Sequence, residues 1–273
     1  MRRINICKIA ITDHCGATCT LCPQHTVTPQ RTMSPDMFND VLHVVWKQCK
    51  ELFINSTGDY LSLPNHQEYS DILARHMRWA GGPTVSVTTN GNFHSRPHIH
   101  THVLVCSLNA VEPEAFEKHI GIQGGLDRVV ENIRQLCRDH GYVEIHSVKW
   151  AGNPHPERRL LELFGDTQAY IRICEEPSNQ MEIVTDGAQA DVTRKRAPCS
   201  YLTGTTITPA GDVKRCAHDF FDADILGHYA ELDAALDRRD KIMAQHQAGQ
   251  YLGVCSRCDF NLAQPVTFNW IKR

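Results

Sequence analysis

Short apolar runs alternate with amphipathic segments along the first two thirds of this 273-residue chain. The runs are short and rich in β-branched residues, as buried strands are, whereas the segments between them carry apolar residues at helical spacing. The expected strands are residues 4–11, 52–54, 84–88, 103–106, 143–148 and 169–174. Strands and helices that alternate in this way build a parallel sheet covered by helices. The sequence therefore predicts an α/β fold with six parallel strands, either open or curled into a partial (β/α)6 barrel.

The clearest helix start is at Ser34, a good N-cap residue that is followed by Pro35 at the first helical position. Apolar residues at helical spacing predict helices over residues 35–49, 69–79, 126–137, 158–164 and 230–248. Both open sheets and barrels of this class form their sites beyond the carboxyl ends of the strands. Residues that follow each strand are therefore the first candidates for function.

Three cysteines follow the first strand within eight residues, at Cys15, Cys19 and Cys22. Their thiols lie on one short loop and can converge on one metal centre. Three thiolates are one fewer than a closed zinc site or a fully ligated 4Fe-4S cluster needs, so a metal held here keeps an open position. A zinc knuckle completed by His14 or His25 is the alternative.

The C-x3-C-x2-C spacing resembles the signature of the radical SAM superfamily. In that family three cysteines hold a 4Fe-4S cluster, and S-adenosylmethionine (SAM) binds the fourth iron. The resemblance implies this role for Cys15, Cys19 and Cys22. The residue before the third cysteine is usually aromatic and lies near the adenine, so the resemblance assigns Leu21 to the cofactor site, although leucine makes a weaker adenine contact than an aromatic ring.

Polar turns after the second, third and fourth strands match further motifs of the same family. Gly58 and Asp59 stand where the family has a Gly-Gly-Glu-Pro-like motif around the SAM amino group, in a degenerate copy with one glycine, a shorter acid and no proline. Thr89 and Asn90 resemble the turn near the SAM ribose, and Ser107 resembles the serine near the SAM carboxylate. Ordinary βα turns are the alternative for each motif taken alone.

Polar residues after the fifth and sixth strands lie where this family brings its substrate to SAM. We assign Lys149, Glu175 and Glu176 to catalysis, as candidates for polar contacts or for removing a proton from a substrate radical, and Asn153 to the cofactor-binding set. Solvated loop residues are the alternative interpretation.

A second cysteine set comprises Cys199, Cys216, Cys255 and Cys258. Two β-prone runs joined by residues 209–211 predict a hairpin that brings Cys199 near Cys216. Four thiolates can fully ligate either zinc or a 4Fe-4S cluster, and spacing alone does not separate the two.

This set resembles the auxiliary-cluster domains called SPASM and twitch, and the single-cluster twitch form fits better because no cysteine follows Cys258. The resemblance implies a second 4Fe-4S cluster with four protein ligands, which serves electron transfer or structural support. A composition change near residue 181 divides the chain into a radical SAM core over 1–180 and a small auxiliary domain with a hairpin and a helix over 181–273.

Composition and the first residues of the chain indicate the cellular compartment and the kinds of partner to expect. The chain begins with Met1, Arg2 and Arg3 rather than an apolar signal segment, and no stretch has the length of a membrane span, so we expect a reducing cytoplasm and no membrane contact. With 28 basic and 31 acidic residues, the net charge of -3 gives no global attraction to nucleic acid. Five cysteines outside the two sets are expected to be buried apolar residues: Cys7, Cys49, Cys106, Cys137 and Cys174.

The resemblance implies an oxidoreductase or isomerase that cleaves SAM to a 5'-deoxyadenosyl radical and removes hydrogen from an unactivated C–H bond. It also implies a reducing partner such as flavodoxin or ferredoxin. A small polar or peptidyl substrate is favoured, and a nucleobase in DNA is the alternative because the runs at residues 2–3 and 194–196 are basic. A different class, a non-catalytic iron-sulfur carrier or zinc scaffold, predicts no SAM binding.

Overall fold

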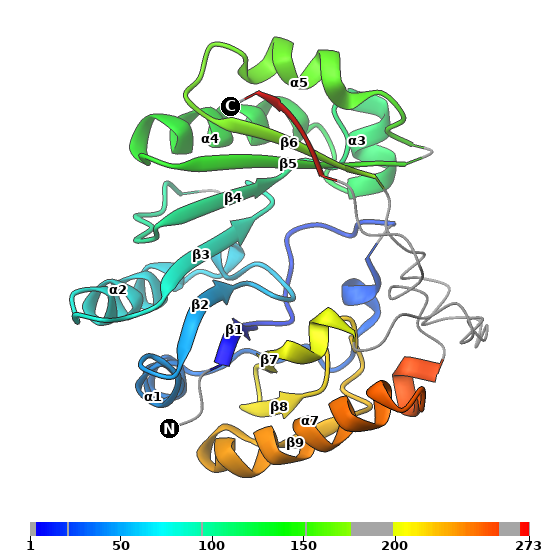
Figure 1. The fold of residues 1–273 in the computed structure, drawn as a ribbon. Helices are drawn as coiled ribbons and strands as arrows, with labels where there is room; N and C mark the ends of the chain where they lie inside the picture. Colours follow the sequence, from blue (N-terminus) through cyan, green and yellow to red (C-terminus); the bar gives the residue numbers. More distant parts are fainter. Residues whose placement is uncertain are drawn as a thin grey trace.

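A computed structural model describes residues 4–20, 22–93, 95–150, 152–175, 199–256 and 268–272 (Figure 1). Six neighbouring strands of one sheet run parallel and in chain order: β1 (Ile4–Ile9), β2 (Cys49–Ile54), β3 (Thr84–Thr89), β4 (Val103–Ser107), β5 (Val143–Lys149) and β6 (Tyr170–Glu175). This confirms the predicted α/β fold and all six expected strands.

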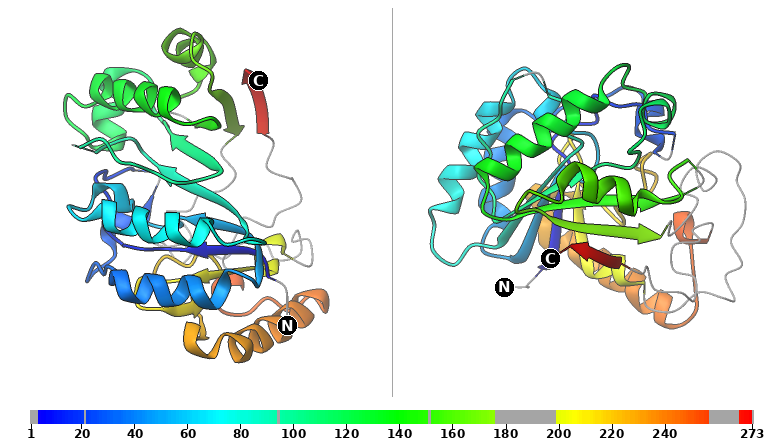
Figure 2. Two further views of the ribbon diagram at one scale, coloured as in Figure 1. Left: turned by 90° about the vertical axis from the view of Figure 1, so that its left-hand side faces the viewer. Right: turned by 90° about the horizontal axis from the view of Figure 1, so that it is seen from above.

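The helices of this part are α1 (Pro35–Val45), α2 (His66–Met77), α3 (Pro113–Ile120), α4 (Leu126–Asp139) and α5 (Pro156–Phe164). They lie on the outer side of the curved sheet (Figure 2). The hydroxyl of Ser34 accepts a hydrogen bond from the backbone N–H of Met37 at 3.1 Å, which confirms the expected N-cap of α1. No helix in the described ranges is both long and apolar enough to cross a bilayer.

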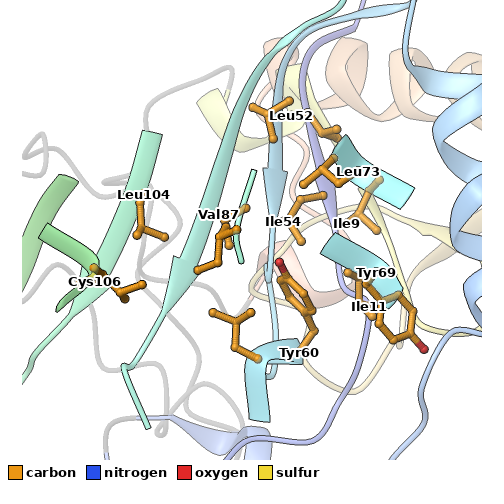
Figure 3. Packing of buried hydrophobic residues seen from close by; sticks show 14 of the residues in the cluster. Ile9, Ile11, Leu52, Ile54, Tyr60, Tyr69, Leu73, Val87, Leu104 and Cys106 are labelled. Carbon is orange, nitrogen blue, oxygen red and sulfur yellow. The ribbon is translucent and has the colours of Figure 1, made fainter. Parts of the chain in front are cut away.

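The two faces of the sheet differ in chemistry because successive side chains point to opposite sides. On the helix side, paired residues such as Ile9, Ile54, Val87 and Leu104 are fully buried and form a continuous apolar core (Figure 3). Four of the five cysteines expected in the core are buried there or in the helices, whereas Cys174 is half-buried. The opposite face is mixed: it carries polar residues such as Lys8 and Ser86 beside apolar ones such as Phe53 and Val105.

The carboxyl-terminal third extends the same sheet. Strand β7 (Gly204–Ile207) pairs parallel with β1, and β8 (Asp212–Lys214) and β9 (Ile225–His228) continue antiparallel beyond it. Helix α7 (Leu232–Gln247) lies next to β9, and β10 (Phe268–Lys272) pairs antiparallel with β6 (Figure 1).

Antiparallel pairing of β7 with β8 confirms the predicted hairpin. Periodicity predicted neither the pairing of β7 with β1 nor β10. The predicted domain boundary, at residues 180 and 181, lies outside the described residues.

An ionic network joins the loop after β1 to the segment after β8. Arg31 donates to Asp13 at 2.8 Å and to Asp222 at 2.6 Å. The ammonium group of Lys214 contacts the other oxygen of Asp222 at 3.2 Å and donates to the carbonyl of Asp219 at 2.8 Å. Because Asp13 lies two residues before Cys15, the network fixes the start of the first cysteine loop relative to the second cysteine set.

The substitution Lys214→Met tests this network. Lys214 is only 3% exposed, and its removal leaves the Asp219 carbonyl without its donor and Asp222 with one cation instead of two. We expect the free energy of unfolding to fall by about 2–4 kcal/mol in urea titrations, since a buried charged group loses its partner. Lys118→Met, at an exposed position of α3, is the control and should change it by less than about 0.5 kcal/mol. Equal effects of the two substitutions would contradict the role given to Lys214.

Candidate active site

The cysteine loop after β1 is fixed by backbone hydrogen bonds to distant segments. Its His14 carbonyl accepts from the N–H of Asp59 at 2.8 Å, beyond the end of β2. The N–H groups of Thr18 and Thr20 donate to the carbonyls of Ile120 and His119, at the end of α3, at 3.0 and 2.8 Å. The loop therefore has one shape, set by elements that meet at the carboxyl edge of the sheet.

Gly58 allows the close approach of the β2 loop to the cysteine loop. Its φ is +61°, a left-handed conformation that glycine adopts without steric cost. A Cβ atom here would overlap the carbonyl oxygen of Thr12 and lie 2.5 Å from that of His14. The glycine expected at the SAM site thus also has a packing role against the cysteine loop.

The three thiols of the loop are partly buried and close to one another. The pKa of Cys15 and of Cys19 is raised to about 12, chiefly by burial; Asp59 and Cys22 contribute at Cys15, and Cys15 and Cys22 contribute at Cys19. Burial also raises the pKa of Cys22. Thiols in such a place are protonated without a metal, and their mutual repulsion as thiolates makes a cationic centre favourable.

This donor set suits a site-open iron-sulfur cluster, with Cys15, Cys19 and Cys22 as its ligands. As they stand, no three His, Cys, Asp or Glu side chains within the described part of the chain converge closely enough to hold a metal ion. Leu21, which the sequence assigns to the adenine, lies outside the described residues.

The carboxylate of Asp59 links the β2 loop to the β3 loop. It is 3% exposed and accepts hydrogen bonds from Asn55 Nδ2 and Leu61 N on one oxygen, and from Thr89 Oγ1 and Asn90 N on the other, at 2.8 to 3.1 Å. Burial raises the pKa of Asp59, and these hydrogen bonds act in the opposite direction. Two more of the residues predicted for the cofactor, Thr89 and Asn90, are thus brought together by the acid of the β2 turn.

Two hydroxyl groups in the loop after β2 have no hydrogen-bond partner among the described residues. Ser56 Oγ and Thr57 Oγ1 are buried there, and sequence reasoning did not single them out. Buried hydroxyls usually find a partner, so these two groups are suited to contact a ligand. Ser107, predicted for the SAM carboxylate, ends β4 and is half-buried.

Two of the residues predicted after β5, Lys149 and Asn153, make contacts within the chain. Lys149 contacts Glu157 of α5 at 3.3 Å and is in register with Glu175. The amide of Asn153 is buried and donates to Ser147 Oγ and to the carbonyl of Val148 at 3.1 and 3.0 Å, so it shapes the turn after β5. Glu176 lies outside the described residues.

A row of four side chains crosses the face of the sheet opposite the helices, and only one of the four, Ser107, was predicted for the site. Ser107 of β4, His146 of β5, Arg172 of β6 and Trp270 of β10 are paired in register, and the Arg172 guanidinium lies 5.3 Å from the Trp270 ring centre. His146 Nε2 lies 2.6 Å from Glu144 Oε2, and this hydrogen bond lowers the pKa of Glu144. The alternation of apolar and polar residues over 143–148 was the available signal.

Two cysteines of the second set, Cys216 and Cys255, lie on segments that contact each other. Cys216 Sγ accepts from the N–H of His218 at 3.4 Å, and Arg215 Nη1 lies 3.8 Å from Cys255 Sγ while donating to the carbonyl of Leu252 at 2.6 Å. Arg215 therefore holds the segment of Cys255 beside the end of β8. Cys199 leads into β7, the strand paired with β8, and Cys258 lies outside the described residues.

Comparison with known proteins found similarity only at the level of structure. No protein-family model and no curated protein sequence matches the chain. BtrN in complex with AdoMet and 2-DOIA matches with a TM-score of 0.60 at 14% identity, over 98% of this chain and 100% of BtrN.

Two other AdoMet-bound structures match similarly. SuiB from Streptococcus suis has a TM-score of 0.61 at 10% identity over 94% of this chain and 72% of SuiB, and anSMEcpe has 0.61 at 11% over 94% and 92%. These proteins are radical SAM enzymes, and the chain shares their fold.

Replacing Gly58 by alanine should displace the cysteine loop. Gly81→Ala is a matched control, because Gly81 also has a positive φ, +74°, but has open space where its Cβ would lie. The control carries only the backbone cost, about 1 kcal/mol, whereas Gly58→Ala adds the overlap with Thr12 and should cost at least about 2 kcal/mol more in urea unfolding. Iron uptake at the first cysteine set should fall only in Gly58→Ala. Equal losses in the two variants would show that the close approach at Gly58 is not needed.

The buried thiols give the metal-free protein a pH dependence with a definite sign. A thiol whose pKa is about 12 when folded and about 8.5 when unfolded stays protonated in the folded chain while the unfolded chain ionises. Stability from Cys15 and Cys19 is therefore complete below about pH 8.5 and is lost as the pH rises toward 12. The free energy of unfolding from urea titrations between pH 8 and 10.5 should fall less steeply in Cys15→Ala/Cys19→Ala, by about 1 kcal/mol per pH unit for each thiol. Parallel declines would mean that these thiols ionise as freely in the folded as in the unfolded chain.

Proposed function

We propose that this protein is a radical SAM enzyme that uses a 4Fe-4S cluster on Cys15, Cys19 and Cys22. The observation that carries the proposal is the three-thiol loop, fixed at the carboxyl edge of a parallel sheet by the loops after β2 and β3 and by the end of α3. The fold shared with AdoMet-bound BtrN, SuiB and anSMEcpe supports it. When bound, cluster and SAM supply a 5'-deoxyadenosyl radical that removes hydrogen from a C–H bond.

The chain's own residues bind and orient SAM. The hydroxyls of Ser56 and Thr57, with the backbone at Gly58, receive the SAM amino group, because these buried hydroxyls have no partner in the described chain and the Asp59 carboxylate already accepts four hydrogen bonds. Ser107 donates to the SAM carboxylate. Asp59, Thr89 and Asn90 form the ordered wall beside the ribose, and Leu21 lies against the adenine.

The substrate meets SAM over the face of the sheet opposite the helices. His146 Nε2 is held by Glu144, so its Nδ1 is the ring nitrogen that can accept a hydrogen bond from the substrate, and Arg172 beside it supplies donors. Lys149, Glu175 and Glu176 are the candidates for contacts with the substrate or for proton removal, and Asn153 shapes the turn after β5. This mixture of donors and acceptors suits a small polar or peptidyl substrate and either an oxidative or an isomerising outcome.

Cys199, Cys216, Cys255 and Cys258 hold a second 4Fe-4S cluster with four protein ligands. Support comes from the contacts of Arg215, which bring the segments of Cys216 and Cys255 together. A fully ligated cluster suits electron transfer rather than substrate binding. The protein works in the reducing cytoplasm with an electron donor such as flavodoxin or ferredoxin.

Anaerobic reconstitution with iron and sulfide tests the proposal. Wild-type protein should bind about eight irons and, with dithionite and SAM, form 5'-deoxyadenosine. The triple variant Cys15→Ala/Cys19→Ala/Cys22→Ala should retain about four irons and form none, as measured by iron assay, EPR and chromatography. Cys137→Ala, a buried thiol of α4 outside both sets, is the control and should behave as wild type.

Zinc in place of iron at the first site, or 5'-deoxyadenosine formation that survives in the triple variant, would refute the proposal. A non-catalytic carrier or zinc scaffold would then be the better description. About four irons in the wild type, lost in the triple variant, would leave the radical chemistry in place and refute only the second cluster.

A further inference from the structure

The side chain of Asn90 is fixed so that its NH2 group faces the first cysteine of the loop. Its Oδ1 accepts from the backbone N–H of Asn92 at 2.8 Å, and its Nδ2 lies 3.3 Å from Cys15 Sγ. A backbone N–H is only a donor, so the atom facing Asn92 must be the oxygen and the atom facing sulfur must be the nitrogen. The orientation of the amide is therefore determined by its surroundings.

The backbone of Asn90 is fixed as well. Its N–H donates to Asp59 Oδ2 at 2.9 Å, and the preceding residue, Thr89, donates its hydroxyl to the same oxygen at 2.8 Å. Asp59 is bound in turn to the cysteine loop, through its N–H and the carbonyl of His14. The donor on Asn90 and the sulfur on Cys15 are thus held in one rigid unit, which removes the entropy cost of aligning them.

We propose that Asn90 is a positioning residue whose N–H···S hydrogen bond to Cys15 sets the reduction potential of the first cluster. The inference rests on the proposed function, because it requires a cluster at Cys15, Cys19 and Cys22. Reduction adds negative charge to a cluster and its sulfurs, so a donor aimed at a ligating sulfur stabilises the reduced form and raises the potential. It gives Asn90 a role besides forming the wall near the ribose.

Two substitutions isolate the donor. Asn90→Asp is nearly the same size, keeps an oxygen for the N–H of Asn92 and replaces the NH2 group facing Cys15 by a carboxylate oxygen. Asn90→Ala removes the whole amide. Asn269→Asp makes the same chemical change at an exposed position of β10, far from β1 in the sheet order, and is the matched control.

The experiment is an anaerobic redox titration of the reconstituted full-length protein followed by EPR. The signal of the first cluster is identified by its loss in Cys15→Ala/Cys19→Ala/Cys22→Ala. We expect the equilibrium constant for reduction to fall about threefold in Asn90→Ala and about tenfold, about 59 mV for a one-electron couple, in Asn90→Asp. Iron content, measured on the same samples, should match the wild type, and Asn269→Asp should leave the potential unchanged.

A first cluster that forms in Asn90→Asp and keeps the wild-type potential would overturn this inference and leave the proposed function intact. A potential that shifts equally in Asn269→Asp would also overturn it, since net charge alone would then explain the change. A wild-type protein without iron at the three cysteines would overturn the proposed function itself, and this inference with it.

Discussion

The carbonyl of His14 and the N–H groups of Thr18 and Thr20 determine the shape of the candidate site, because each must find a partner once the cysteine loop packs against the sheet. Their partners are backbone groups of the loop after β2 and of the end of α3. Close backbone contact of this kind leaves no room for side chains. Gly121, at the end of α3, is a related case: its φ is +76°, and a Cβ there would overlap the side-chain hydroxyl of Thr18 and not the backbone.

Local patterns predicted the framework of the fold well. The six parallel strands, the Ser34 cap and the antiparallel hairpin of β7 and β8 each depend on residues close in sequence, so periodicity and turn chemistry were sufficient. The predicted site residues after β2, β3 and β4 do lie at the carboxyl edge of the sheet, as the rule for parallel sheets requires. The hydrogen bonds that these residues make at that edge could not be predicted from the pattern.

The sequence pattern did not predict contacts between residues that are far apart in the chain. Asp59 was predicted to face a cofactor, yet both its oxygens accept hydrogen bonds within the chain. The bonds from Asn55 and Leu61 are local, whereas Thr89 and Asn90 are about thirty residues away and no spacing rule connects them to Asp59. His146 was overlooked because a histidine in an alternating strand resembles any polar surface residue. Its place in a row with Ser107 and Arg172 follows only from the register of three strands.

The first strand of the chain lies in the interior of the sheet, with β2 on one edge and β7 on the other. During synthesis β2 follows soon after β1, whereas β7 does not emerge until Gly204–Ile207 have been translated. Until then the second edge of β1 exposes N–H and C=O groups that can pair with another chain. A nascent chain that still lacks β7 therefore exposes a strand edge that the finished sheet covers, so it is more open to aggregation than the folded protein.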